Sequence, residues 1–171
     1  MALADTLTGT IKASLVADLA RLSGNYSGKD TLSHEFALAL TDGSGSSAAT
    51  GWFGTTFTAT TGGITISLAD SDDPLGAAGD DVPTSDPEGL KLRGLLIENK
   101  DTTNYISVKK GTNGEASIFS GSTDSIKITA GGCILWVSPA GVSAMNDTTD
   151  DEILVTADTA SCSVKISYIY G

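Results

Sequence analysis

Short runs in which apolar and polar residues alternate recur along this chain, and no other feature constrains its fold as strongly. In the cleanest run, every second residue from Cys162 to Tyr170 is apolar, and the residues between them are mostly serine and lysine. A period of two is typical of a β-strand with one buried face. The same signal predicts further strands, at 52–60, 64–68, 90–98, 105–109, 116–119, 125–129, 133–137 and 153–157.

Turn signals separate these runs, and no strand–helix–strand rhythm interrupts them. Gly62-Gly63 predicts a hairpin, and Asn113-Gly114 and Gly131-Gly132 predict further turns. Roughly ten short strands with turns every 8–12 residues are typical of an antiparallel sandwich or barrel. The sequence therefore predicts an all-β fold, and we expect an antiparallel β-sandwich.

The run at 7–19 near the N-terminus alternates in the same way. On one side of it lie Leu7, Ile11 and Leu15. A strand is predicted for 7–14, whereas 15–22 also fits the 3.6-residue period of a helix, so both interpretations stay open there.

A break at 23–28 separates this run from a strand predicted at 32–41. One face of the second strand carries Leu32, His34, Phe36, Leu38 and Leu40. We expect 1–30 to form an N-terminal arm and connector that adds a strand to a neighbouring molecule, and 31–171 to form the sandwich domain.

The segment at 70–89 differs from the rest of the chain, because it contains acidic residues and prolines but no lysine or arginine. It is predicted to be an exposed, irregular loop with solvated carboxylates, and the acidic run at 150–152 is interpreted as solvated surface too. Calcium is the alternative for the loop, since hard cations bind clustered carboxylate oxygens. Its candidate ligands are Asp70, Asp72, Asp73, Asp80, Asp81, Asp86 and Glu88.

Charge argues against two classes of partner. The 171 residues carry a formal net charge of −11, whereas nucleic-acid binding needs a basic face that displaces counterions from phosphates. Anionic membrane surfaces are disfavoured for the same reason. No signal peptide is visible at the start of the sequence, and we expect neither a nucleic-acid nor a membrane partner.

Catalytic and metal-binding patterns are weak. His34 is the single histidine and lies on the apolar side of a predicted strand, so we interpret it as a residue at the edge of the core. Cys133 and Cys162 have no CxxC spacing and are interpreted as small buried hydrophobic residues. No GxSxG motif occurs. The sequence therefore predicts a protein that is not an enzyme and has no cofactor and no metal.

Aromatic side chains crowd one predicted strand. Trp52 and Phe53 are neighbours, so strict alternation places them on opposite faces, and at least one should lie outside the core of the monomer. An exposed aromatic residue often marks an interface, and we expect a homotrimer with one of these rings at a neighbouring subunit. Sugar stacking on Trp52, Phe53 and Trp136 is the alternative, as in a carbohydrate-binding module.

Several stretches resemble β-sandwich virion proteins of tailed bacteriophages. The similarity covers about residues 35–171 and is carried by the runs at 36–45, 64–70, 95–108, 128–135 and 162–171. The resemblance implies a jelly-roll-like sandwich without enzymatic activity. It also implies a decoration (cement) protein on the outer surface of the head, or a fibre or tail component, that binds the major capsid protein and itself. The interface residues expected on the combined grounds are Leu7, Ile11, Leu15, Trp52 and Phe53.

Overall fold

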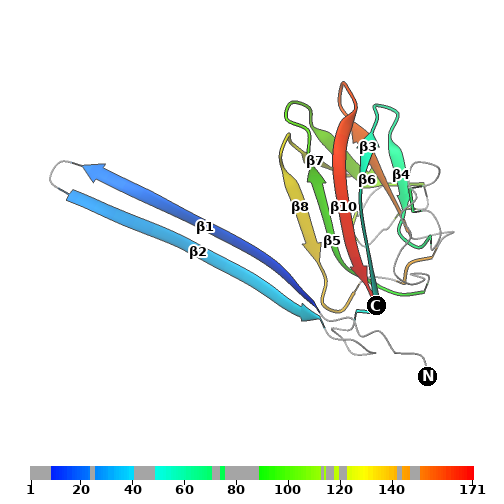
Figure 1. The fold of residues 1–171 in the computed structure, drawn as a ribbon, viewed down its shortest axis with the longest axis horizontal. Helices are drawn as coiled ribbons and strands as arrows, with labels where there is room; N and C mark the ends of the chain where they lie inside the picture. Colours follow the sequence, from blue (N-terminus) through cyan, green and yellow to red (C-terminus); the bar gives the residue numbers. More distant parts are fainter. Residues whose placement is uncertain are drawn as a thin grey trace.

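The computed structural model describes residues 9–23, 26–40, 49–70, 74–75, 89–112, 114, 118–119, 123–141, 144–146 and 151–171, with the backbone alone at 9, 14–23 and 26–34. This part of the chain is all-β, without a helix, and the strands of every sheet pair antiparallel (Figure 1). The strands are β1 (Gly9–Ser23), β2 (Tyr26–Leu40), β3 (Gly51–Ala59), β4 (Ile64–Ser67), β5 (Leu92–Asn99), β6 (Ile106–Lys110), β7 (Ser125–Ile128), β8 (Cys133–Val137), β9 (Glu152–Ala157) and β10 (Cys162–Tyr170). Within these ranges, a helix able to cross a membrane is not found.

Two four-stranded sheets form what we call the body. Their strand orders are β3-β10-β5-β8 and β4-β9-β6-β7. The third sheet contains only β1 and β2, which we call the hairpin, and it projects away from the body (Figure 1). The strand expected at 32–41 as part of the sandwich therefore pairs with β1 instead. The helical alternative at 15–22 is wrong, because these residues continue β1 along β2.

The two sheets of the body share one hydrophobic core. Alternation explains it, because every second residue of β10 from Cys162 to Tyr170 is buried, whereas Ser163 and Lys165 between them are exposed. The first sheet contributes Phe53, Phe57, Leu95, Ile97, Val164, Ile166 and Tyr168. The second contributes Ile66, Ile106, Val108, Ile128, Ile153 and Val155. Burial of these two apolar faces against each other is the main force that holds the body together.

Aromatic rings fill one end of this core. The ring centroids of Phe53 and Tyr168 lie 5.1 Å apart, and those of Tyr168 and Tyr170 lie 5.9 Å apart. The Tyr168 hydroxyl is buried and has no hydrogen-bond partner among the described residues. Burial raises the pKa of Tyr168 far above its ordinary value, so the ring stays neutral.

Asn99 at the end of β5 ties two loops together. Its Nδ2 donates to the carbonyl oxygens of Asn104 (2.9 Å), Ile128 (3.2 Å) and Thr129 (3.2 Å). Its Oδ1 accepts a hydrogen bond from the backbone N–H of Asp101 at 3.1 Å. A buried amide with these partners fixes the β5–β6 connection against the end of β7.

The two Gly-Gly pairs form corners between the sheets. Gly63 and Gly131 adopt positive φ angles of 85° and 69°. The backbone N–H of Gly63 donates to Thr60, which closes a tight turn. However, β3 and β4 belong to different sheets, so the hairpin predicted at Gly62-Gly63 is wrong. The turn predicted at Gly131-Gly132 is confirmed, and it carries the chain from β7 to β8 in the other sheet.

Three further expectations need correction. In the run predicted as a strand at 116–119, the described residues Ile118 and Phe119 belong to no strand, and Phe119 fills the core instead. Asp151 was expected in solvent but is buried, where it accepts a hydrogen bond from the Ser67 hydroxyl. Cys162 is buried as expected, whereas Cys133 is exposed because it begins an edge strand on the outer face; both thiols are free.

Candidate functional site

The outer face of the β3-β10-β5-β8 sheet, which points away from the core, is apolar at one end. Register places Trp52 beside Ile169, Ile169 beside Gly94, and Gly94 beside Val137. In the next row toward the other end of the sheet, Leu96 pairs with Leu135. An outer sheet face of this composition is expected to be covered, because exposed sheet faces usually carry polar residues.

A β-bulge in β5 places a glycine on this face, at the point where the hairpin packs. Gly94 pairs with Ile169 but Leu92 pairs with Tyr170, so Arg93 is the extra residue. The bulge turns Leu92 into the core and leaves Gly94 on the outer face. The Arg93 side chain then donates to the carbonyl oxygens of Gly171 (2.9 Å) and Pro139 (2.7 Å), which holds the bulged segment in place.

The base of the hairpin packs into the space that Gly94 leaves. A Cβ atom at Gly94 would lie 2.6 Å from Cδ1 of Ile11, closer than real atoms approach. Ile11 is consequently only 8% exposed. It belongs to a small second cluster with Leu40 and Ala49, against which Leu38, Leu135, Val137 and Ile169 pack. The base of the hairpin is thus anchored on the outside of the body, with the Ile11 side chain in the hollow at Gly94 and Leu40 buried in the same cluster.

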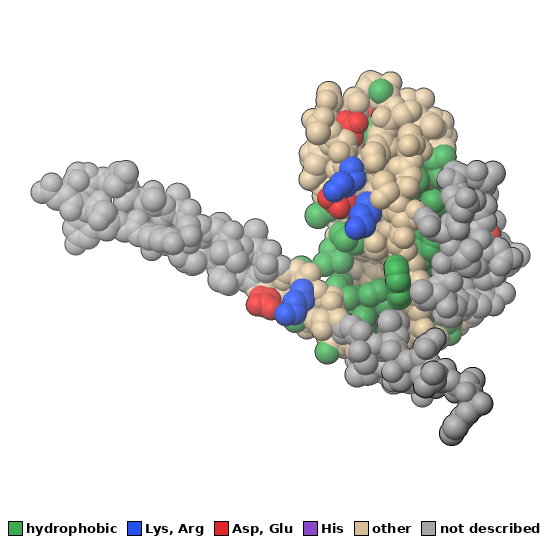
Figure 2. Space-filling model, in the orientation of Figure 1, with side chains coloured by type: hydrophobic (Ala, Val, Ile, Leu, Met, Phe, Trp, Pro, Cys, Tyr) green, Lys and Arg blue, Asp and Glu red, His purple; other side chains and the backbone are tan. Residues whose placement is uncertain are grey.

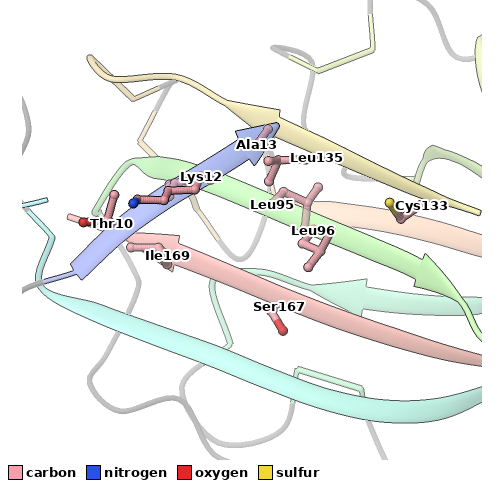
Figure 3. A pocket seen from close by; sticks show the side chains of 11 residues that line it. Thr10, Lys12, Ala13, Leu95, Leu96, Cys133, Leu135, Ser167 and Ile169 are labelled. Atoms are coloured by element: carbon pink, nitrogen blue, oxygen red, sulfur yellow. The ribbon is translucent and has the colours of Figure 1, made fainter. Parts of the chain in front are cut away.

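An open groove of about 460 Å³ lies beside this anchor, and we call it the groove (Figure 3). One wall is the base of β1, from Thr10 to Ala13, and the floor is the outer face of β10, β5 and β8. Its floor includes Leu96, Leu135 and Ile169, with Cys133 toward one end. In the space-filling view, hydrophobic side chains gather on the body where the hairpin joins it (Figure 2). A smaller hollow of about 250 Å³ lies between Ala13, Phe36, Leu135 and Val137.

The groove ends where the outer face becomes polar. Register places Lys165 beside Glu98, and Lys100 Nζ lies 3.0 Å from Glu98 Oε1. These exposed charges contribute little to stability. They do limit the apolar part of the face to the end that is nearest to the hairpin.

The residues expected at an interface lie in different environments. Ile11 is buried within its own chain, and Trp52 is 49% exposed on the same outer face of the sheet. Phe53 is 2% exposed, so the expectation that it reaches another molecule is wrong for this ring, which packs on Tyr168 instead. Leu15 has a backbone position in β1 opposite His34, and Leu7 lies outside the described residues.

The three aromatic residues considered for sugar stacking do not share a face. Trp52 lies on the outer face, whereas Phe53 is in the core and Trp136 packs against it. These rings therefore form no common platform. Among the acids considered for calcium, Asp70 alone is described; the others lie outside the described residues. Where side chains are described, no group of three or more His, Cys, Asp or Glu is placed to hold a metal ion.

Sequence reasoning missed the floor of the groove, although a signal was present. Residues 95–97 and 134–137 are apolar at every position, and Ile169 interrupts the polar side of its strand. Strands that are apolar on both sides are typical of sheets covered on both faces. Gly94 gave no signal, because its role depends on a side chain more than eighty positions earlier in the chain. Comparisons with models of protein families, with curated proteins and with solved structures found no match to this chain.

Proposed function

We propose that this chain is a structural protein of a tailed-bacteriophage virion, a decoration protein that binds the outside of the head and stabilises it. It acts through contact area and carries out no reaction, with no cofactor and no metal. Its partners are the major capsid protein and further copies of itself, as a homotrimer. The observation that carries the proposal is a long hairpin projecting from an eight-stranded body of two antiparallel sheets.

The strand order supports a jelly-roll-like sandwich for the body. Counted from one to eight, strands β3 to β10 follow the orders 1-8-3-6 and 2-7-4-5. Four of the pairings, β3 with β10, β4 with β9, β5 with β8 and β6 with β7, are those of one long antiparallel hairpin folded over into two sheets. Jelly rolls have this arrangement and are common in viral capsid proteins, although a fold alone does not establish a function.

The hairpin supports the role of an arm. In the described chain β1 and β2 pair only with each other, so the outward backbone groups of both strands remain available to another chain. A two-stranded sheet alone is at best marginally stable in water. A hairpin of this length therefore suits a protein whose final structure forms in contact with neighbours, as in a shell.

The charge supports a place outside the DNA-filled head. A net charge of −11 would repel a packaged phosphate backbone. The outer surface of the head requires no such contact. Bridging of several capsid subunits by a trimer would then add weak contacts through effective concentration.

Mass spectrometry of purified virions from the phage that encodes the chain tests the proposal. We expect the chain in large, fixed proportion to the major capsid protein, and its absence from virions would overturn the proposal.

Binding to heads stripped of the protein tests the arm. Replacement of 16–33 by an Asn-Gly turn should abolish binding to these heads, while the melting temperature of the body is retained. Thr58→Ala, on an exposed position of β3, is the matched control and should bind normally.

A further inference from the structure

The register of the hairpin gathers apolar residues on one face. Ile11 pairs with Leu38, Ala13 with Phe36 and Ala17 with Leu32. Directly opposite residues of an antiparallel pair share a face, and so does every second residue along each strand. We call this the apolar face of the hairpin; its members are Ile11, Ala13, Leu15, Ala17 and Leu19 of β1 with Leu32, His34, Phe36, Leu38 and Leu40 of β2. The opposite face carries mostly polar and small residues, with Val16 and Leu22 as its large apolar positions; its polar members include Thr10, Lys12, Ser14, Asp18, Lys29, Thr31, Ser33 and Glu35.

The body covers only the first part of this face. At the base, Ile11 and Leu40 are buried against the outer sheet face. One pair further out, Phe36 is already 40% exposed and Ala13 is exposed as well. Beyond that pair the strands leave the body and continue to the tip (Figure 1). The apolar face therefore continues from an interface that exists within the chain as far as Leu19, where Asp30 lies opposite, and the described residues provide nothing against its outer part.

The size of the face favours a partner. The apolar face runs over nine residues of β1, from Ile11 to Leu19, which extend about 30 Å, and two strands are about 10 Å wide, so the face measures about 300 Å². This is the lower end of the range for the largest apolar patch on a typical monomer, here on a sheet that is only marginally stable by itself. Laid on a matching surface, it would bury up to about 600 Å² in total, which is the size of a weak contact, and a closed ring adds such contacts together.

Every copy of the chain already presents a matching surface. The groove has an apolar floor of Leu96, Leu135 and Ile169, and it lies directly beside the place where the same sheet face receives the base of its own hairpin. Trp52 extends this surface beyond Ile169. The groove therefore offers the same kind of apolar surface that the base of the hairpin packs against, and it is open.

We propose that the outer part of the hairpin's apolar face docks in the groove of a second copy of this chain. Arm and groove are different surfaces, so the contact is head-to-tail, and a rotation that closes produces a ring. In a ring each copy contributes one arm and one groove, which doubles the buried area per copy. The inference deepens the self-association part of the proposed function, but it requires no virion and is tested on the purified chain.

Sedimentation velocity at micromolar concentration tests the arm. The wild-type chain should sediment as a closed oligomer. Leu15→Glu, on the apolar face, should weaken association at least about tenfold, because the interface would have to bury a charge. Ser14→Glu adds the same charge on the opposite face of the same strand and should leave association unchanged. A monomeric wild-type chain, or equal association of the two variants, would overturn the proposal.

The exposed Cys133 reports on the groove. Its thiol should react with maleimide at least about tenfold more slowly in the wild-type oligomer than in Leu15→Glu, because the docked arm covers it. Cys162 adds no background, since burial raises the pKa of its thiol and keeps it protonated. Association with equal labelling rates would show that arms pack on one another or elsewhere, and would overturn the assignment of the groove. Absence of the chain from virions would overturn the proposed function but would not change the sedimentation and labelling results. The two proposals can therefore be refuted independently.

Discussion

The body and the hairpin are both antiparallel β-structure, yet they are stabilised in different ways. In the body, each sheet buries its apolar face against the other, and residues such as Ile166 and Ile153 are fully buried. In the hairpin, the backbone pairing is as regular, and the buried side chains described there belong to a small cluster at the base. The difference shows that alternation specifies a strand with an apolar face. Burial of that face depends on a second surface, which the local sequence does not contain.

The largest contrast between the two regions should appear in their tolerance of truncation. Ile166→Ala removes a fully buried side chain from the centre of β10 and should lower the free energy of unfolding by about 2–5 kcal/mol. Leu15→Ala, in the hairpin, should change it by less than about 0.5 kcal/mol when dilution keeps the chain monomeric. Urea denaturation checks both values. Equal losses would show that the hairpin is part of the cooperative core.

The loop anchor at Asn99 should have the next largest effect. Asn99→Ala leaves three carbonyl oxygens without their shared donor and should cost about 1–3 kcal/mol in urea denaturation. Thr159→Ala is the matched control, because it removes an exposed side-chain hydrogen bond of 2.9 Å to Asn104 in the same loop region. The control should cost less than about 0.5 kcal/mol. A similar loss from both would mean that Asn99 acts only as a surface residue.

The junction between the two regions can be tested by a double-mutant cycle. Gly94→Ala places a Cβ against Cδ1 of Ile11 and should destabilise the base of the hairpin by about 1–2 kcal/mol. Ile11→Val removes that Cδ1 atom. In the Ile11→Val background, Gly94→Ala should therefore be neutral or stabilising, since alanine loses less backbone entropy than glycine on folding. Additive effects in the cycle would contradict the packing of Ile11 into the Gly94 hollow.

The smallest expected effect concerns pH. Backbone N–H groups of Asn104 and Thr103 donate to Asp101 at 2.6 and 2.7 Å, and they lower the pKa of its carboxyl below the ordinary value. A lowered folded-state pKa means that this contribution is present above the unfolded pKa of about 4 and is lost as pH falls through the folded pKa. Melting temperatures of Asp101→Asn should converge with those of the wild type at low pH. A difference that is the same at every pH would contradict this origin.

Much of the body could be predicted from sequence, because strand positions are local information. The ranges predicted at 133–137 and 162–170 coincide with β8 and β10. The pairing of the strands was not predictable, since Gly62-Gly63 signals a turn but contains no information about the partner of each flanking strand. β3 finds its partner β10 more than a hundred residues away. The corner was consequently mistaken for a hairpin.

The candidate site was predictable only in part. Alternation was enough to place Trp52 and Phe53 on opposite sides, and burial decides which of them faces outward. The two apolar faces at 7–19 and 32–41 were visible separately, but only the register of the hairpin joins them into one surface. The groove was not predictable, because it is formed by a bulge, a glycine and residues from β1, β5, β8 and β10.

Hydrogen–deuterium exchange of the full chain over a dilution series tests the central claim most directly, because it observes both regions in one experiment. If the hairpin is an intermolecular element, its amides in β1 and β2 should be protected when the chain is concentrated. They should lose protection on dilution, while those of β5 and β10 stay protected throughout. Protection of the hairpin that does not change with concentration would contradict the account.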